Sequence, residues 1–508
     1  MSEPFRFSPN ENRAHEIRWR HWSREAFDEA VESERPILLN LTTTWCQSCR
    51  EMDETTYSDD GVIELVNESL IPVRVDADRQ PHIQDRYIAG GWPTNAVLTP
   101  TGELFWADTY MEPRELRRVV QGVLDGWRDR RDELRAEISR RRKAMEATRA
   151  RRPVHRILRR EAADDVLTGA QQQFDARNGG FGDAPKFIHA EAVELLFEQG
   201  RALPNPDWVA MAERTLDGMM AGEIEDAVEG GFFHYALAAD WTRPQVEKLL
   251  SVNARALRAL AVGSAYARRD DWLAAAERAV AWVHGTLGRD GLWCGSQAAD
   301  ADYFATNAAG RAARTAPAVD PTIYTDSAAM WIAALADAGR LLDRDDWKDR
   351  AARGLETLFR TMDATGDSLV HYRAPDGEPP RGLLVDLLHA ARAACAVSEA
   401  TGDQSALQHA LRLVRTMRDR LWDGNGGFND IPHDPAPLGA LRYRDRPFEE
   451  NALAARLHVA LARRTGEASH RAVAERVLAF LSPFAGRYAV EGASFALAVE
   501  EFFELRRR

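Results

Sequence analysis

Two cysteines with two residues between them, Cys46 and Cys49, form the stretch of this sequence with the clearest chemistry. They follow an apolar run over residues 37–41 and precede a segment of helical composition, so Cys46 is expected at a helix N-terminus. There, free backbone N–H groups and the helix dipole stabilise a thiolate, lower its pKa and make it the attacking nucleophile. Cys49, one helical turn further on, would resolve the mixed disulfide. The spacing predicts a redox-active dithiol, with Trp45 covering one side of the nucleophilic sulfur.

Two other interpretations of the cysteine pair stay open, a zinc half-site and a vestigial pair. A zinc site needs further Cys or His ligands, and His82 is the only nearby candidate in the sequence. The other cysteines, Cys294 and Cys395, are isolated, so they indicate no disulfide framework. We expect a reducing, cytoplasmic location, and neither a metal nor another cofactor.

The segments around the dithiol predict an α/β domain over residues 1–126. The continuous apolar run at 37–41 indicates a strand buried on both faces, and residues 70–75 indicate a second strand. A strand–helix–strand order implies a right-handed parallel unit. Residues 94–99 and 103–106 predict an antiparallel hairpin, because the turn Pro100-Thr101-Gly102 joins them. Helices are expected at 22–31, 51–57, 60–67, 81–89 and 112–124.

This order of elements, with Gly91-Trp92-Pro93-Thr94 before the hairpin, resembles a thioredoxin-like domain. The resemblance implies that Pro93 is the cis-proline, which places backbone groups against the dithiol to pair with the extended chain of a substrate. Thioredoxins also carry a buried acid on the strand before the motif, whereas this chain has Asn40, which cannot take a proton. Deprotonation of Cys49 would then rely on Glu51 or water. We therefore expect a specialised or regulatory dithiol rather than a general reductase.

Length and charge restrict what the rest of the chain can be. With 508 residues and a formal net charge of −13, the protein is too long for one ordinary core and too acidic for a generic nucleic-acid surface. No window contains the roughly eighteen continuous apolar residues of a membrane span, so no membrane partner is expected. Residues 127–155, dense in arginine with interleaved acids, predict a charged, solvated linker helix, with an anionic partner site as the alternative.

From residue 156 to residue 508, amphipathic helical patterns replace strand patterns. A short phrase with glycine before an aromatic or apolar residue recurs between the helical stretches, at spacings typical of a helical hairpin with its loop. The copies are 178–181, 229–232, 290–293 and 425–428, with 366–369 as a weaker one. About 350 residues divided in this way accommodate six hairpins. We therefore predict an all-α (α/α)6 toroid, resembling those of six-hairpin glycosidases and N-acylglucosamine 2-epimerases.

Loop residues of such a toroid are candidates for a second site, because a sugar funnel needs acids, bases and hydrogen-bonding groups. The candidate catalytic residues are His234, Glu247, Lys248, Asp300, Asp302 and Asp386, with Asp326, His371 and the run 449–451 as further ones. Lys186 and Lys248 are two of only four lysines, which indicates positions where a compact ammonium is needed. The alternative for each candidate is structural: a helix-capping acid, a hydrogen-bonded core histidine or a buried ion pair.

Across both halves, the motifs resemble one family, the spermatogenesis-associated protein 20-like proteins. The resemblance rests on residues 45–50, 90–94, 179–187, 230–235, 241–244, 247–250, 253–254, 300–302, 386 and 450–451, in that order. It implies a thioredoxin-like domain fused to a six-hairpin toroid, and it implies no defined reaction.

Three hypotheses on function follow from these features. The leading one is a thiol–disulfide oxidoreductase or redox-regulated protein, with a protein disulfide as partner. The second is a carbohydrate-active enzyme, an epimerase or glycoside hydrolase, which acts on a sugar-like small molecule in the toroid with the thioredoxin-like domain as accessory. The third is a binding protein without turnover. The sites decide between them, because one fold hosts many functions.

Overall fold

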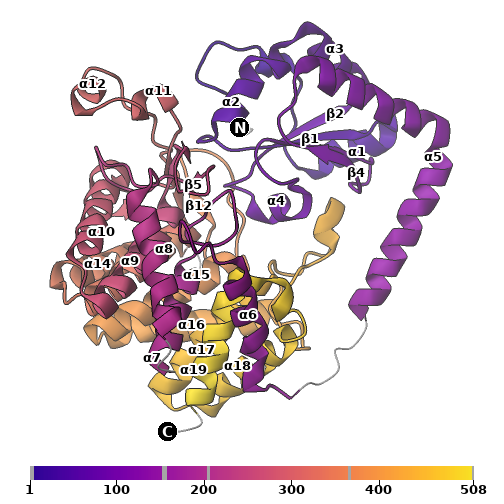
Figure 1. Cartoon of the computed structure of the whole chain (residues 1–508). Coiled ribbons are helices and arrows are strands. Elements are labelled where there is room, and N and C mark those ends of the chain that lie inside the picture. Colours follow the sequence, from indigo (N-terminus) through magenta and orange to yellow (C-terminus); the bar gives the residue numbers. More distant parts are fainter. Residues whose placement is uncertain (1–4, 151–156, 203–205, 364–367, 506–508) are drawn as a thin grey trace. The chain divides into compact units, whose positions relative to one another are not determined.

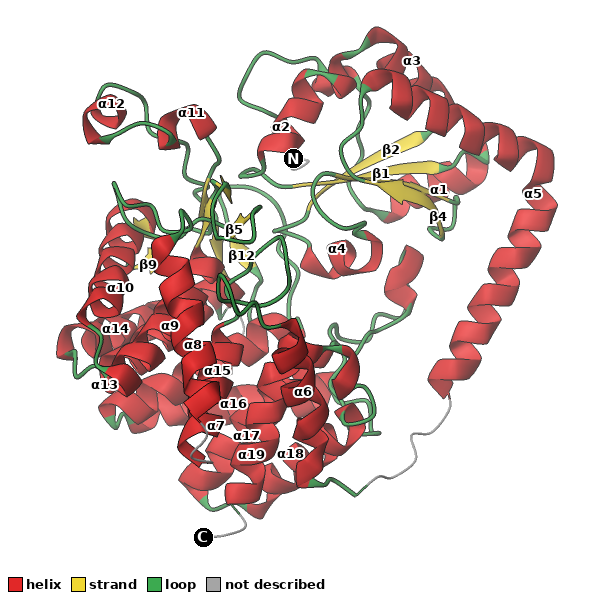
Figure 2. Cartoon of the chain, in the orientation of Figure 1, coloured by secondary structure: helices red, strands yellow, loops and turns green. Residues whose placement is uncertain are grey.

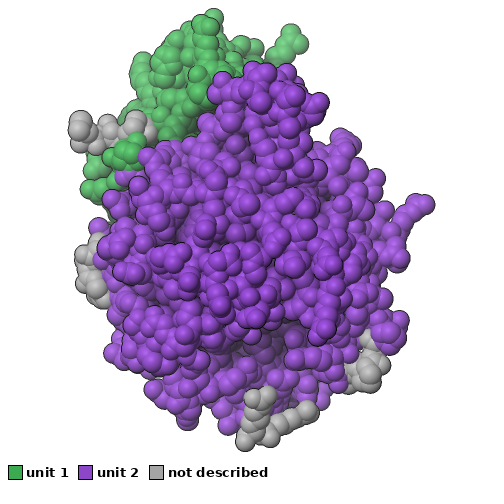
Figure 3. Space-filling model, turned by 90° about the vertical axis from the view of Figure 1, so that its left-hand side faces the viewer, with its two compact units in different colours: residues 1–153, 375–380, 433–444 green, residues 154–374, 381–432, 445–508 purple. Residues whose placement is uncertain are grey.

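The computed structural model of the chain describes residues 5–150, 157–202, 206–363 and 368–505. The chain divides into two compact units, which Figure 3 colours separately. The first unit contains residues up to 153 together with 375–380 and 433–444, and the second contains the remainder. Within the described ranges, no helix is both long enough and apolar enough to cross a membrane.

The first unit is built on a four-stranded sheet in the order β2-β1-β3-β4 (Figure 1). Strand β1 (Ile37–Thr42) pairs in parallel with β2 (Ile71–Asp76), and β3 (Thr94–Leu98) pairs antiparallel with both β1 and β4 (Leu104–Asp108). Every residue of β1 is buried, as its continuous apolar run predicts. The predicted α/β sheet, parallel first and antiparallel last, is confirmed.

Helices cover both faces of this sheet. On one face, α1 (Arg24–Ser33) and α4 (Pro81–Tyr87) contribute to the core around Leu39 and Leu41. On the other face, the core around Leu38 takes its side chains from three further helices. These are α2 (Gln47–Glu54), α3 (Asp60–Ser69) and the first part of α5 (Pro113–Ala150). The change of face between Leu38 and Leu39 is the two-residue period of a strand.

Helix α5 joins two helices that the sequence predicts separately, at 112–124 and 127–152. Gly126 continues the helix, and the departure from helical geometry comes later, at Arg130, with φ −130° and ψ 25°. Residues 151–155 of the predicted linker lie outside the described residues.

A segment far away in the sequence completes the core of the first unit. The Tyr87 hydroxyl donates to the Gly102 carbonyl at 2.7 Å and accepts the N–H of Ala440 at 2.8 Å. Leu438 and Leu441 pack against the core around α1 and α4. Residues 433–444 therefore act as a strap that belongs to the core of this unit.

The second unit, largely helical in Figures 1 and 2, is a closed ring of six helical hairpins. Its inner helices are α7 (Ala190–Ala202), α9 (Leu250–Ala267), α13 (Thr325–Leu341), α15 (Leu384–Thr401), α17 (Phe448–Thr465) and α19 (Ala493–Glu504). Each inner helix contacts the next one in this order, and α19 contacts α7, which closes the ring. The predicted (α/α)6 toroid is therefore confirmed.

Each inner helix packs against one outer helix. The outer helices, in the order of their inner partners, are α8 (Pro206–Ala221), α10 (Asp270–Trp282), α14 (Asp345–Met362), α16 (Gln404–Leu421), α18 (Ala468–Leu481) and α6 (Asp164–Gln173). Helix α15 shows why a sequence takes the inner position: it is rich in alanine and buried around most of its circumference, so neighbours can approach on both sides. Helix α14 carries its buried residues on one face, as an outer helix requires.

The two ends of the toroid differ. All six inner helices begin after a long segment that follows an outer helix, such as residues 222–249 and 288–324. Short strands pair these segments, among them β7 (Lys248–Leu249) with β10 (Ser296–Gln297) and β11 (Ile323–Tyr324) with β12 (Tyr372–Arg373) (Figure 2). We call this the loop end. At the opposite end, the far end, tight turns such as 402–403 join inner to outer helices.

Candidate functional site

The dithiol lies where the sequence places it, at the N-terminus of α2. Cys46 is the N-cap residue, and its Sγ accepts the backbone N–H of Cys49 at 3.2 Å. Both cysteines are free thiols, with exposed fractions of 6% for Cys46 and 3% for Cys49. An N–H donor directed at the sulfur stabilises the thiolate form of Cys46.

The Cys46 sulfur also faces the loop that the resemblance assigns to substrate pairing. The peptide bond between Trp92 and Pro93 is cis, as expected for this loop. The Sγ of Cys46 lies 3.6 Å from the carbonyl oxygen of Trp92. Trp45 packs edge-on against Trp92 with 5.3 Å between ring centroids, and its Nε1 donates to Asp78 at 2.8 Å. The backbone next to Pro93 is thus in reach of the nucleophile.

Asn40, where thioredoxins carry an acid, is buried, and its Nδ2 donates to the Oδ1 of Asn95 at 3.2 Å. The same Asn95 oxygen accepts the Tyr57 hydroxyl. Burial raises the pKa of Tyr57 far above its ordinary value, so the phenol stays protonated. Glu51 is exposed on α2. Asn40, Asn95 and Tyr57 therefore accept no proton at neutral pH, and the carboxylate of Asp53 near Tyr57 is bound by Arg74 at 2.8 Å.

In the toroid, Lys248 holds a turn together. It is fully buried, and its Nζ lies 2.6 Å from the Oδ2 of Asp226 and 2.8 Å from the carbonyl oxygen of Gly230. Arg311 binds the same carboxylate through two nitrogens, at 2.6 and 2.9 Å. Burial lowers the pKa of Lys248 to about 8, although Asp226 acts in the opposite direction. These contacts place Lys248 in a structural ion pair behind the second Gly-Gly-Phe turn.

Lys186 closes the first such turn with the same chemistry. Its Nζ binds Asp175 at 2.9 Å and the carbonyl oxygen of Gly182 at 2.6 Å. In the fourth copy an arginine, Arg446, pairs with Asp423. An ammonium can bind a carboxylate and a backbone carbonyl in one small space, which explains two of the four lysines. Of the weaker copy, residues 366 and 367 lie outside the described residues.

Asparagines on the inner helices clamp the same turns. Asn451 accepts the N–H of Phe428 at 2.7 Å and donates to the carbonyl of Phe428 at 3.0 Å, and Asn253 repeats both bonds with Phe232. Asp300 caps α11 (Ala301–Phe304) by accepting the N–H of Tyr303 at 2.9 Å, and Asp302 is exposed. Several residues that stood out by type in the sequence thus stabilise the loops of the toroid.

Two histidine–carboxylate dyads remain at the loop end. His234 Nδ1 lies 2.8 Å from Glu247 Oε1, and His371 Nδ1 lies 2.8 Å from Asp386 Oδ1. The His234 side chain is 15% exposed to solvent, whereas the His371 side chain is 1% exposed. Burial raises the pKa of Asp386 to about 6, although His371 opposes this rise. The dyads therefore contain groups suited to proton transfer near neutral pH.

Asp326 stands beside the second dyad. The ligand-type atoms of Asp326, His371 and Asp386 all lie within 4.8 Å of one another. One imidazole and two carboxylates are ligand types that divalent ions accept.

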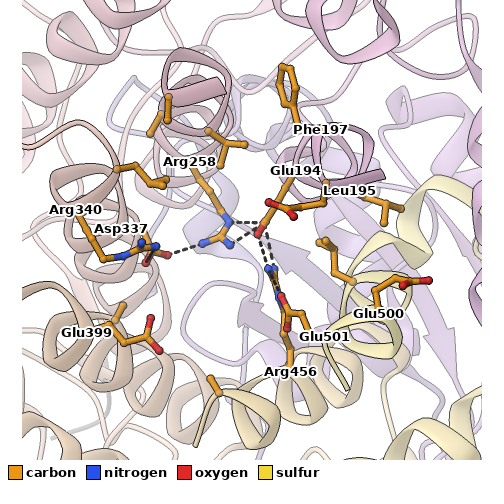
Figure 4. A pocket seen from close by; sticks show the side chains of 18 of the residues that line it. Glu194, Leu195, Phe197, Arg258, Asp337, Arg340, Glu399, Arg456, Glu500 and Glu501 are labelled. Atoms are coloured by element: carbon orange, nitrogen blue, oxygen red, sulfur yellow. Dashed lines mark hydrogen bonds and ion pairs between the residues drawn. The ribbon is translucent and has the colours of Figure 1, made fainter. Parts of the chain in front are cut away.

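A cavity lies elsewhere, between the C-terminal halves of the inner helices. Its volume is about 670 Å3, and none of the residues predicted from sequence line it. Glu194 of α7 binds Arg258 of α9 at 2.7 Å and also Arg456 of α17 (Figure 4). Arg258 continues to Asp337 of α13 at 2.6 Å, and Arg456 to Glu501 of α19. The feature of the sequence that could have indicated this cavity is the presence of charged residues within otherwise apolar helices.

The two units define the class of protein, a thioredoxin-like domain joined to an (α/α)6 toroid. The cellobiose 2-epimerase of Spirochaeta thermophila is similar over 68% of this chain and 96% of its own, with a TM-score of 0.54 and 16% identity. A family GH76 α-mannanase of Bacteroides thetaiotaomicron covers the same shares at a TM-score of 0.51 and 11% identity. At these identities the likeness concerns the fold alone.

Sequence relatives match part of the chain. Residues 9–146 match the family described as Thioredox_DsbH, protein of unknown function, DUF255. Spermatogenesis-associated protein 20 of Rattus norvegicus is 30% identical over 255 residues, which are 46% of this chain and 32% of the relative. The thiol:disulfide interchange protein DsbD of Campylobacter jejuni is 35% identical over 57 residues, 11% of this chain and 10% of that protein. The resemblance predicted from the motifs is confirmed, and the chain spans about a third of the length of the Rattus relative.

Proposed function

We propose that the first unit performs thiol–disulfide exchange. The observation that carries this proposal is the position of Cys46, whose sulfur receives the N–H of Cys49 at 3.2 Å and lies 3.6 Å from the carbonyl beside cis-Pro93. A helix-terminal sulfur beside a backbone carbonyl of the cis-proline loop suits attack on an extended disulfide substrate. The similarity to a thiol:disulfide interchange protein, 35% identity over 57 residues, supports the same chemistry.

The reaction proceeds in two exchanges. The Cys46 thiolate attacks one sulfur of a substrate disulfide, the second substrate sulfur leaves as a thiolate, and a mixed disulfide forms. Cys49, as thiolate, then attacks Cys46, which releases the first substrate sulfur and leaves a Cys46–Cys49 disulfide. The substrate gains two electrons, the dithiol loses two, and an external dithiol reductant must restore it. Since Asn40 and Tyr57 supply no base on this side, we expect a slow second exchange.

The test is a trapping experiment with matched single substitutions. Cys49→Ser leaves Cys46 able to attack but removes the resolving thiol, so mixed disulfides with protein partners should accumulate and disappear on reduction. Cys46→Ser is the control and should trap nothing. Equal trapping by both variants, or none by Cys49→Ser, would refute the proposal.

The two dyads favour a second function, acid–base catalysis on a carbohydrate at the loop end. A His–carboxylate pair can remove a proton from a carbon next to a sugar carbonyl, and a second pair can return one. This favours epimerisation over glycoside hydrolysis, which needs two opposed carboxyl groups. The toroid likeness to a cellobiose 2-epimerase is consistent with it.

Deuterium exchange into sugars would test the second function. Incubation of cellobiose, mannose and N-acetylglucosamine in D2O with the full chain should place deuterium at the carbon next to the carbonyl. His234→Asn should abolish the deuterium labelling. The fold should be kept in this variant, because the Asn253 clamp on the same turn remains intact. Sugars that stay unlabelled and unconverted would count against catalysis in the toroid.

A further inference from the structure

The ion-pair network in the far-end cavity connects five of the six inner helices. Glu194, Arg258, Asp337, Arg456 and Glu501 supply α7, α9, α13, α17 and α19 (Figure 4). Each of its two arginines binds carboxylates from two different helices. Burial acts to raise the pKa of Glu194, but Arg258 and Arg456 outweigh it and hold that pKa well below its ordinary value. Glu194 is therefore a charged carboxylate, and each acid of the network is already bound to an arginine.

The sixth helix, α15, contributes a cation without such a partner. Arg392 lines the cavity, and among the described residues no carboxylate lies within ion-pair distance of its guanidinium. Its one hydrogen bond to a side chain runs from Nη1 to the Nδ1 of His389, at 3.4 Å. Burial, and then the positive charge of Arg392, lower the pKa of His389 well below its ordinary value, so this imidazole is a neutral acceptor.

Burial, followed by the charge of Arg258, lowers the pKa of Arg392 to about 10. Two carboxylates, Glu191 and Asp337, act to raise the pKa of Arg392, but burial and the charges of other arginines outweigh them. A guanidinium presents five N–H donors in a planar fork that matches a carboxylate or phosphate, and Arg392 lines the cavity with no carboxylate of the described residues bound to it. An anion placed against this fork would gain charge-assisted hydrogen bonds and relieve the repulsion among three arginines.

The wall of the cavity also offers an apolar surface. Phe197 and Tyr266 pack with 4.6 Å between their ring centroids and an interplanar angle of 33°, and Tyr266 remains 40% exposed. Such a surface contacts the ring or carbon skeleton of an organic molecule. The volume of about 670 Å3 is in the range of small-molecule sites.

We propose that the far-end cavity binds a small organic anion whose carboxylate or phosphate pairs with Arg392. Several acids also line the cavity, but Asp337, Glu194 and Glu501 are paired with arginines. Burial raises the pKa of Glu399, which favours its protonated form, and that form donates a hydrogen bond to an anion instead of repelling it. This site is at the opposite end of the toroid from the two dyads, so it is independent of both proposed reactions.

Calorimetric titration of the full chain tests the proposal. The probes are glucuronate and glucose 6-phosphate, with inorganic phosphate to separate an organic ligand from a free anion and glucose as the neutral counterpart. We expect both organic anions to bind, inorganic phosphate to bind more weakly, and glucose to show no heat of binding. Concentrations up to about 10 mM detect a dissociation constant as weak as about 1 mM.

Two substitutions at one position localise the site. Arg392→Met keeps the side-chain length but removes the charge, and should weaken binding of both organic anions at least tenfold. Arg392→Lys keeps the charge without the planar fork, so its affinity should lie between that of the wild-type protein and that of Arg392→Met. Arg415→Met, on the exposed side of outer helix α16, is the matched control and should leave affinity unchanged.

Three outcomes would overturn the proposal. They are the absence of binding by both organic anions, equal affinity in the wild-type protein and Arg392→Met, and glucose binding as tightly as glucose 6-phosphate. Thermal unfolding of each variant shows whether it is folded. If Arg392→Met does not fold, the affinity of Arg392→Lys compared with that of the wild-type protein still tests the proposal. Cys46→Ser should leave the titration unchanged, which separates this site from the dithiol.

Discussion

The buried cluster of Asp226, Lys248 and Arg311 allows a structural role of Lys248 to be measured against a catalytic one. Lys248→Met removes the ammonium but leaves Asp226 bound by Arg311 through two nitrogens. Asp226→Asn leaves Lys248 without its bound carboxylate and leaves Arg311 with Glu229, whose Oε2 lies 3.1 Å from its Nη1. We therefore expect Asp226→Asn to destabilise the toroid more than Lys248→Met does, although both remove the same 2.6 Å contact.

The magnitudes follow from the contacts. Each charge-assisted hydrogen bond of Lys248 contributes about 1.5–3 kcal/mol. Against this, burial of the ammonium costs free energy that its removal relieves, since the pKa of Lys248 is lowered from 10.5 to about 8 even with these bonds in place. The net cost of Lys248→Met should be about 1–2 kcal/mol, whereas leaving uncompensated buried charge costs about 3–5 kcal/mol in Asp226→Asn.

The pH dependence provides a second readout. Because the folded-state pKa of Lys248 is lowered, the unfolded chain binds more protons between pH 8 and pH 10.5. The stability of the wild-type protein should therefore rise, relative to Lys248→Met, as pH increases through this window. Below pH 8 both states carry the charged lysine, and the difference between the two proteins should stay constant.

Urea unfolding of the toroid transition is the assay, with Asp217→Asn as a control at a half-exposed ion pair on α8. This control should change the free energy of unfolding by less than about 1 kcal/mol. If Lys248→Met lowers the free energy of unfolding as much as Asp226→Asn does, Arg311 does not compensate the charge of Asp226 in the absence of Lys248, and the reasoning is wrong. Loss of a toroid activity without loss of stability in Lys248→Met would instead establish a chemical role.

Three further predictions use the same unfolding assay. Asp386→Asn should gain stability relative to the wild-type protein as pH rises from about 4 to about 6. The folded-state pKa of Asp386 is raised, so the stability that its protonated form contributes to the wild-type protein is lost in that window. If Asp386→Asn instead loses stability there relative to the wild-type protein, Asp386 forms an ion pair with charged His371. Asn451→Ala, which removes three hydrogen bonds of a buried clamp, should cost about 2–4 kcal/mol, and an effect below 1 kcal/mol would contradict the clamp. Without ligand, Arg392→Met should stabilise the toroid by about 1–2 kcal/mol, because it removes a poorly compensated buried charge whose effect cavity water partly screens; destabilisation would mean that Arg392 is adequately paired.

Features that depend on neighbours in the sequence were accessible from the sequence. Cys46 is the N-cap of α2 because the residues that make the cap and the helix follow one another directly. The buried strand β1, the cis peptide before Pro93 and the six hairpins likewise rest on local runs, motifs and repeats. In each case the pattern that folds is contained in a window of a few tens of residues.

The role of a charged side chain was not accessible in this way. Lys248 stood out by composition, but the carboxylate and the carbonyl that it binds identify it as part of a buried turn. His234 and His371 became dyads only when the fold brought Glu247 and Asp386 to their rings. Residue type indicates what a group can do, and its partners decide what it does.

The sequence alone therefore determined the reactive dithiol and the two architectures, since local spacing and periodicity specify both. Tertiary structure decided that residues 433–444 complete the core of the first unit around Tyr87, and that Arg392 faces a cavity in which Glu194 is bound to other arginines. The partners in that network lie as far apart in the chain as Glu194 and Arg456. Closing the ring of helices is what brings such residues together, and no local pattern encodes it.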